Sequence, residues 1–212
     1  MHPELQKFDE TVAALTAAGQ PFELDTAQVN GIEYLNFASM PASLGQYYLL
    51  MQAHAQKDFA AYLDERYSFG EAYQHSAEFA TALQQQFGVG KGDRVAILSR
   101  NNPQWMMAFI GATAIGAVAV PMNAWWTTEE LDYGFEDSGA RVVVADRERI
   151  ERLAPIAEKH GLQIVSIDDC SGLDVEHTPF ADLLAAHTGA GMPQVEVAAD
   201  ELSLIHISEP TR

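Results

Sequence analysis

The stretch KGDRVAILSRNNPQWMMAFIGATAIGAVAVPMNAWWTTEEL, residues 91–131, decides the fold of this chain. Arg94 to Ser99 is a short, mostly apolar run after a glycine-rich turn, which predicts a buried β-strand. Asn102 then precedes Pro103, the pattern of a helix N-cap with proline at the first helical position. Apolar residues recur at helical spacing up to Gly116, which we expect to end this helix.

A second strand and a second helix follow in the same stretch. Ala117 to Met122 is another apolar run, and Thr127 with Glu130 three residues later forms a capping box that starts a helix. Two strands joined by a helix of about this length are most simply a right-handed parallel βαβ unit.

The alternation of strand and helix continues towards the C-terminus. We expect strands at 141–145 and 162–167, a helix at 147–160 between them, and a short helix capped by Thr178-Pro179. Repeated alternation of this kind predicts an α/β fold, with a doubly wound, mostly parallel sheet and helices on both faces.

The N-terminal part shows a different organisation. Its patterns predict an amphipathic helix at 4–18, a hairpin at 22–37 around Asn30-Gly31, a helix at 43–56 and a hairpin at 59–68. We expect 1–57 to be a helical and hairpin extension, and 58–201 to be the first part of the main domain.

The central stretch resembles the N-terminal part of the adenylate-forming (AMP-binding) acyl-CoA synthetase superfamily, which includes the fatty-acid–CoA ligases. The resemblance rests on five motifs in order, which are KGDRVAI at 91–97, an Asn-rich turn with an aromatic at 101–105, a Gly/Ala-rich helix at 111–117, a Pro-Asn strand end at 121–123 and a helix start at 128–131. The similarity extends from about Tyr67 to Ile167.

The resemblance implies a parent enzyme that activates a carboxylic acid with ATP and Mg²⁺ and then transfers the acyl group to CoA. In that family a Ser/Thr/Gly-rich phosphate loop with a lysine follows the matched region, and this chain has no such loop. We therefore expect an inactive N-terminal fragment with no catalytic, cofactor-binding or metal residues to assign and no tight binding of ATP, Mg²⁺ or CoA. The resemblance leaves the identity of the acid open.

The last eleven residues, LSLIHISEPTR at 202–212, are what one reading frame of a transposase sequencing adapter encodes. A segment of this origin is excluded from reasoning about the fold. We expect the native sequence to end near Glu201 and the tail to be non-native.

Two alternatives from other functional classes stay open at this point. One is a non-catalytic, flavodoxin-like binding domain, which requires the tail to be native. The other is an acidic interaction protein with the Trp125-Trp126 loop as its contact.

Composition narrows the choice of partners. The 12 basic and 30 acidic residues give a formal charge of −18, which repels nucleic acid and anionic membranes. Cys170 is the only cysteine, so an intrachain disulfide and a thiolate metal cluster are excluded. With no visible secretory signal or membrane span, we expect a cytoplasmic protein with a small carboxylic acid as the parent's substrate, and consider a homodimer.

Four groups of residues are candidate sites. The glycine run at 88–92 follows a helix and precedes a strand, so it indicates a turn rather than a phosphate loop. Residues 100–102 lie at a strand end where ligands bind in α/β sheets, but helix capping is favoured. For Trp125-Trp126, packing or a dimer contact is favoured. For Asp168-Asp169, a solvated loop is favoured, and a cation site is the alternative. The seven histidines show no metal-ligand spacing.

Overall fold

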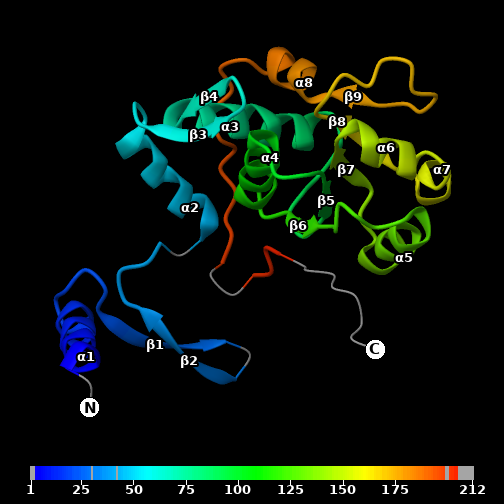
Figure 1. The fold of residues 1–212 in the computed structure, drawn as a ribbon. Helices are drawn as coiled ribbons and strands as arrows, with labels where there is room; N and C mark the ends of the chain where they lie inside the picture. The colour runs from blue at the N-terminus through cyan, green and yellow to red at the C-terminus, as the bar shows by residue number, and fades with distance from the viewer. Residues whose placement is uncertain (1–2, 30, 42, 199–200, 205–212) are drawn as a thin grey trace. The chain divides into compact units, whose positions relative to one another are not determined.

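The computed structural model describes residues 3–29, 31–41, 43–198 and 201–204 (Figure 1). The chain divides into two compact units, Met1–Ala42 and Ser43–Arg212. We call them the N-terminal unit and the sheet unit and describe each by itself.

Within the described part of the sheet unit, five strands form a parallel sheet in the order β6-β5-β7-β8-β9. They are β5 (Arg94–Leu98), β6 (Val118–Pro121), β7 (Val142–Ala145), β8 (Gln163–Ser166) and β9 (Thr178–Pro179). This confirms the predicted doubly wound α/β class. Strands β6 and β7 are consecutive in the chain but flank β5 on opposite sides, so the winding direction reverses beside β5.

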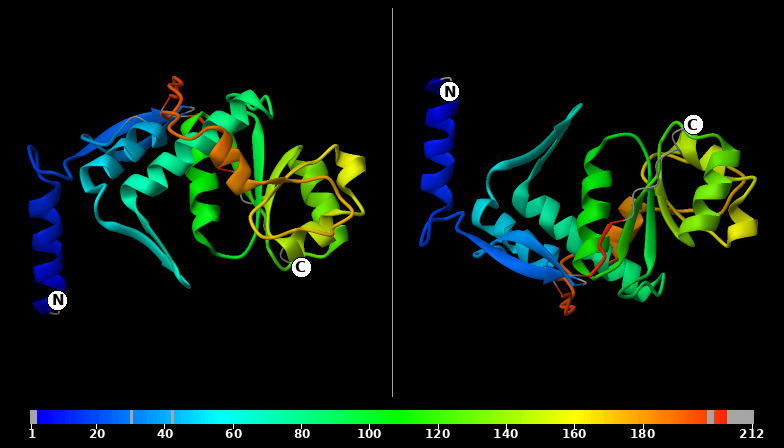
Figure 2. Two further views of the ribbon diagram at one scale, coloured as in Figure 1. Left: turned by 90° about the horizontal axis from the view of Figure 1, so that it is seen from above. Right: turned by 90° about the horizontal axis from the view of Figure 1, so that it is seen from below.

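Helices cover both faces of this sheet (Figure 2). One face carries α2 (Leu44–Tyr48), the 3₁₀ helix η1 (Leu49–His54), α3 (Phe69–Gln85), α4 (Pro103–Ala114) and α8 (Phe180–Ala186). The other carries α5 (Thr128–Ser138), α6 (Arg147–Leu153) and α7 (Ala157–His160). Successive strand residues serve opposite faces, since Val95 packs in the first cluster and Ala96 in the second.

The predicted helix starts are present. The Asn102 side chain accepts a hydrogen bond from the Trp105 amide at 2.7 Å, with Pro103 in the first helical turn of α4. A reciprocal capping box links Thr127 to Glu130 at the start of α5. Side-chain capping satisfies amides that a helix leaves unpaired at its N-terminus, which is why these signals are readable in a sequence.

Three element boundaries differ from the prediction. The helix expected at 147–160 is broken into α6 and α7, because Pro155 lacks an amide hydrogen and clashes with the preceding turn. The helix expected at 43–56 continues after Tyr48 as the 3₁₀ helix η1. Thr178-Pro179 forms β9 instead of a cap, and α8 starts after Pro179 with no side-chain capping bond.

Two antiparallel hairpins lie outside the parallel sheet. In the sheet unit, β3 (Asp58–Tyr62) pairs with β4 (Glu65–Ser68), as predicted. In the N-terminal unit, β1 (Leu24–Val29) pairs with β2 (Ile32–Phe37) after α1 (Pro3–Thr16). The hairpin agrees with the prediction, although Asn30 of its expected turn is outside the described residues.

The chain beyond α8 returns to the free edge of β6. The Ala119 amide donates to the Ser203 carbonyl at 2.9 Å, and Ala119 forms an isolated parallel bridge with Leu204. Lys91 holds this segment through the Glu196 carbonyl at 3.0 Å and the Glu201 carboxylate at 2.6 Å. Most of the proposed adapter-encoded tail, 205–212, lies outside the described residues. No helix in the described ranges is long and apolar enough to cross a membrane.

Candidate functional site

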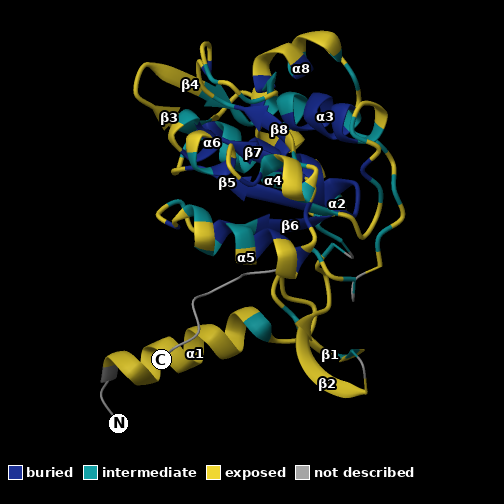
Figure 3. Cartoon of the chain, turned by 90° about the vertical axis from the view of Figure 1, so that its right-hand side faces the viewer, coloured by how far each residue is buried: buried dark blue, intermediate teal, exposed yellow. Residues whose placement is uncertain are grey.

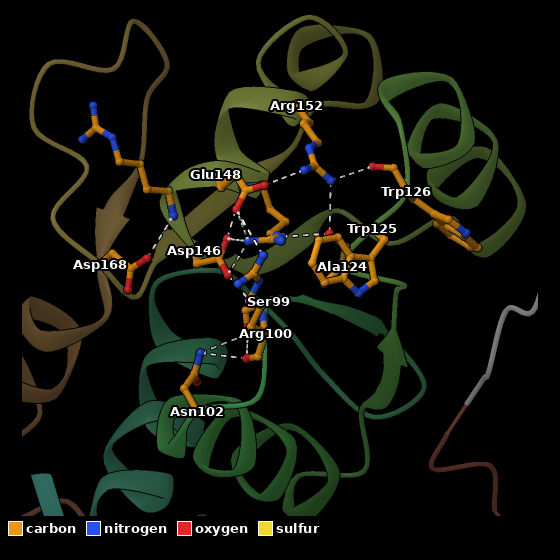
Figure 4. A network of polar contacts seen from close by, with 12 residues as sticks. Ser99, Arg100, Asn102, Ala124, Trp125, Trp126, Asp146, Glu148, Arg152 and Asp168 are labelled. Carbon is orange, nitrogen blue, oxygen red and sulfur yellow. Dashed lines mark hydrogen bonds and ion pairs between the residues drawn. The ribbon is translucent and has the colours of Figure 1, made fainter. Parts of the chain in front are cut away.

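The candidate site lies at the carboxyl edge of the parallel sheet, where the winding direction reverses. Ser99 and Arg100 follow β5, Asp146 and Arg147 follow β7, and Asp168 follows β8 (Figure 4). In open α/β sheets the crossover connections diverge at this point and leave a crevice for ligands. A cavity of about 420 Å³ lies here, bordered also by Tyr62 of the β3–β4 hairpin.

Asp146 organises this edge by capping α6 and joining two strand ends. Its side chain accepts hydrogen bonds from the Arg149 amide at 3.2 Å and from the Arg100 amide at 3.1 Å. The same carboxylate forms an ion pair with the Arg149 guanidinium at 3.1 Å. Because Asp146 is only 7% exposed, these bonds fix the ends of β5 and β7 relative to each other.

Arg149 is the most deeply buried charge of the site, with 2% of its surface exposed. Its Nε donates to the Ala124 carbonyl at 2.9 Å, and its Nη1 contacts Asp146 and Glu148. Its Nη2 has no hydrogen-bond partner among the described residues. A buried guanidinium with one free nitrogen retains donor capacity towards this edge.

The two adjacent tryptophans have different environments. Trp126 is buried against α5, where a Cβ on Gly134 would come within 2.9 Å of its ring. The packing role favoured for the pair therefore holds for Trp126 alone. Trp125 is 68% exposed, and the Arg100 guanidinium carbon lies 4.6 Å from its ring centroid. Trp125 and Arg100 therefore form an exposed cation–π pair at the rim of the site.

Arg152 holds the tryptophan loop in place. Its Nη1 donates to the carbonyls of Ala124 and Trp126, each at 3.1 Å, and its Nη2 contacts Glu148 at 2.6 Å. Since Arg149 also donates to the Ala124 carbonyl, α6 fixes the backbone of the loop through two arginines.

The charges of the cavity nearly cancel. Three guanidinium groups, from Arg100, Arg147 and Arg149, face four carboxylates, from Asp146, Glu148, Glu151 and Asp168. An apolar cavity of about 390 Å³ adjoins it, because Tyr62 and Asn102 line both. Together they offer polar positions beside an apolar wall, the usual composition of a small-molecule site.

The other predicted candidates have structural roles. Asn102 caps α4, and its Nδ2 donates to the Arg100 carbonyl at 2.9 Å, so capping is confirmed; Asn101 lines the apolar cavity. Asp168 accepts from the Arg147 amide at 3.2 Å. The Asp169 carboxylate accepts a hydrogen bond from the Ser171 amide. The hydrogen bonds from Ser171 lower the pKa of the Asp169 carboxyl group. The described residues contain no group of three or more His, Cys, Asp or Glu that fits a metal ion.

The glycine run and the cysteine also have structural roles. Gly88 and Gly92 adopt positive φ angles of 65° and 83°, and the Asp93 side chain accepts from the Gly90 amide at 2.8 Å, so the run is a turn. Burial, followed by the negative charge of Asp168, raises the pKa of the Cys170 thiol. A thiol in such surroundings stays protonated and unreactive.

The sequence reasoning missed Asp146, Arg149 and Arg152. Arg149 and Arg152 lay within the helix expected at 147–160, where charged residues are usually solvated, and Asp146 lay between this helix and the strand expected before it. The sequence contained one signal for this contact. Asp146 directly follows an expected strand and precedes Arg149 by three residues. This spacing indicates an N-cap whose side chain can meet that of Arg149 in the first helical turn.

The fold and this edge together define an α/β ligand-binding domain with its polar crevice at the point where the winding reverses. Residues 49–206 match the model of the family described as AMP-binding enzyme. That match covers well over half of the chain, and the chain therefore belongs to the AMP-binding enzyme family.

Curated proteins with similar sequences carry CoA ligase names. The chain is 34% identical over 122 residues to 4-coumarate–CoA ligase 3 of Oryza sativa subsp. japonica, covering 58% of this chain and 21% of that protein. It is 33% identical over 103 residues to a long-chain-fatty-acid–CoA ligase of Salmonella typhimurium, covering 49% and 18%. The chain thus spans about a fifth of the length of these relatives.

Solved structures share the fold. The chain superimposes on an anthranilate CoA ligase in complex with anthranoyl-AMP with a TM-score of 0.70 and 21% identity, covering 79% of this chain and 32% of that one. At this identity the likeness establishes the fold alone. The family match and the similarity to this structure do not favour the two alternatives, a flavodoxin-like binding domain and an acidic interaction protein.

Proposed function

We propose that this chain is the N-terminal part of an ATP-dependent acyl-CoA synthetase. The observation that carries the proposal is the family match over 49–206, supported by the CoA ligase names of both relatives described above. The proposed substrates are a carboxylic acid, ATP and CoA.

The proposed reaction divides one difficult condensation into two displacements. A carboxylate oxygen bonds to the α-phosphorus of ATP and pyrophosphate leaves, which gives an acyl-adenylate. The CoA thiol, on losing its proton, then bonds to the acyl carbon and AMP leaves. Both steps need stabilisation of negative charge on phosphate oxygens. Mg²⁺ would supply part of this stabilisation when bound, although the described residues contain no group of three or more His, Cys, Asp or Glu side chains that could hold it by themselves.

We assign the carboxyl edge a binding role in this reaction. Arg100 and Trp125 are exposed and adjacent, so they can contact a phosphate and an aromatic base of a nucleotide substrate. The buried network of Asp146 and Arg149 keeps their loops in position. Since carboxylates outnumber guanidinium groups in this cavity, we expect weak nucleotide binding by this chain alone.

We further propose that the 212-residue chain forms no acyl-adenylate. The carboxyl edge offers anchoring groups, but its four carboxylates outnumber its three guanidinium groups, so it offers little stabilisation to negative charge on phosphate oxygens. Binding groups without a centre that stabilises the transition state give little catalysis.

The test compares this chain with the protein encoded by the uninterrupted genomic reading frame across codon 201, read from DNA prepared without transposase adapters. We expect a longer frame in place of residues 202–212, and ATP–pyrophosphate exchange with a panel of carboxylic acids only in its product. Exchange by the purified 212-residue chain would refute the inactivity. A longer product that forms no acyl-CoA with any acid would refute the proposed function.

The panel also addresses what the family leaves open. Aromatic, long-chain and short-chain acids are all included, because the relatives' names already cover aromatic and fatty acids. We propose a cytoplasmic protein, because the proposed reaction uses ATP and CoA. We also propose a homodimer, which sedimentation of the protein encoded by the uninterrupted reading frame would test.

A further inference from the structure

A second cavity lies at the opposite, amino edge of the sheet, away from the candidate site. It has a volume of about 810 Å³ and is formed by the loop after α3, the end of α5, the starts of β5 and β7 and the end of α7. Its walls include the apolar side chains of Phe87, Phe135 and Val142. The proposed function makes no use of this cavity.

The charge of this cavity is opposite to that of the chain. Arg94, Arg141, Lys159 and His160 line it, whereas the carboxylates that line it are those of Asp93 and Glu136. The chain as a whole carries a formal charge of −18, and the carboxyl-edge cavity has more carboxylates than cations. A local excess of cations in an acidic chain attracts anions to this position.

Two of the four basic groups are already paired. Lys159 contacts Asp132 at 2.6 Å, and His160 contacts the same carboxylate at 2.7 Å. The hydrogen bond from Lys159 and, to a smaller extent, the one from His160 hold the pKa of Asp132 below its ordinary value. Glu136 lies 3.9 Å from Lys159, and Asp93 accepts from the Gly90 amide. The charge that remains for a ligand therefore comes from the two arginines.

Arg94 is paired with backbone carbonyls only. Its Nε donates to the Ser138 carbonyl at 3.0 Å and its Nη1 to the Gly92 carbonyl at 3.0 Å. The last carbonyls of a helix repel anions, and Arg94 offsets this effect at the end of α5. A Cβ on Gly139 would lie 3.4 Å from its Nη2, so this nitrogen lies next to the backbone turn that ends α5.

Arg141 is the freer of the two. Its side chain is exposed and makes no hydrogen bond or ion pair with any described residue, although its backbone carbonyl accepts from the Gln163 amide at 2.8 Å. Val95 of β5 pairs with Val142 of β7. Arg94 and Arg141 are the residues directly before these two, so they occupy equivalent positions on adjacent strands. Side chains at equivalent positions of neighbouring parallel strands lie on the same face, and both arginines line the cavity.

We propose that this amino-edge cavity binds a small organic anion, with a phosphate or carboxylate group held by Arg94 and Arg141. Guanidinium groups pair with both kinds of group through two parallel hydrogen bonds. The concave shape of this mostly polar cavity suits a compact molecule rather than an extended peptide.

The test is a titration of the isotope-labelled 212-residue chain with inorganic phosphate and, separately, with succinate, followed by backbone amide chemical shifts. We expect the largest shifts at Gly139, Arg141 and Gly161. Arg141→Gln should weaken binding about fivefold, because one exposed charged hydrogen-bonding group is lost. The tighter of the two anions identifies the phosphate or the carboxylate class.

The matched control is Arg66→Gln. Arg66 is also exposed and donates only to backbone carbonyls, but it lies outside the cavity, so its loss should leave binding unchanged. The proposal is overturned if neither anion binds, if Arg141→Gln has no effect, or if Arg66→Gln weakens binding equally. Largest shifts at Arg100 and Asp146 would also overturn it, since the anion would then occupy the carboxyl edge.

Discussion

Helices α1 and α3 carry the same kind of apolar stripe and differ in what covers it. In α1 the residues at helical spacing are Leu5, Phe8, Val12 and Leu15, and each is between 41% and 64% exposed. In α3 the inward residues include Phe79 and Leu83, which are fully buried. Figure 3 shows α1 mostly in the colour of exposed residues, whereas α3 has much of its length in the colours of buried and intermediate residues. An apolar pattern thus indicates that a helix forms and which side faces a partner, but the partner sets the stabilisation.

The packing of α3 comes from close neighbours on one face of the sheet. The Phe79 ring lies 4.9 Å from that of Phe180 in α8, and both belong to the larger hydrophobic cluster. Across from it, α4 approaches so closely that a Cβ on Gly111 would come within 2.8 Å of the Ser76 carbonyl oxygen. Three predictions follow from the difference between α1 and α3, and each is measured by urea denaturation of the whole chain.

The largest effect is expected for Phe79→Ala. Removing a fully buried ring leaves a cavity in the core, so the free energy of unfolding should fall by about 3–5 kcal/mol. Tryptophan fluorescence reports this transition, because all three tryptophans belong to the sheet unit. A loss below about 1 kcal/mol, the typical cost of an arbitrary substitution, would show that α3 is not packed as described.

A smaller effect is expected for Gly111→Ala. The added methyl group would meet the Ser76 carbonyl and Phe79, so we expect a loss of about 1–3 kcal/mol despite the higher helix propensity of alanine. The control is Gly45→Ala, where the nearest atom would lie at an ordinary 3.4 Å. If both variants unfold at the same urea concentration, the close approach of α4 to α3 is wrong.

The smallest effect is expected for Phe8→Ala, which makes the same change as Phe79→Ala on the other helix. Because Phe8 is 64% exposed, the stability should change by no more than about 0.5 kcal/mol. Far-UV circular dichroism supplies the readout for α1, which contains no tryptophan. A loss approaching that of Phe79→Ala would mean that something covers the apolar side of α1 in solution.

Much of the fold was predictable because its signals are local. Asn102 with Pro103, and Thr127 with Glu130, mark helix starts through bonds that span three residues, and the structure contains both. The alternation of strands and helices predicts the parallel sheet, and the structure contains it. The sequence also contains the signal for the break between α6 and α7, because Pro155 cannot donate a backbone hydrogen bond within a helix.

The candidate site was less predictable because its contacts join distant residues. Arg149 meets the Ala124 carbonyl across 25 positions, and Asp146 meets the Arg100 amide across 46. Such pairs exist only once β5 and β7 are adjacent in the sheet. Trp126 and Trp125 are neighbours of the same residue type, so only the position of α5 decides that one is buried and the other exposed.

The exposed ring at the carboxyl edge also has an optical consequence. Trp126 is buried and Trp105 stacks on Phe109, whereas Trp125 faces solvent beside the positive charge of Arg100. A neutral collisional quencher such as acrylamide reaches exposed indoles most readily, so quenching of the intrinsic emission falls mainly on Trp125. The unlabelled molecule therefore carries its own reporter, whose brightness changes when a ligand shields that rim.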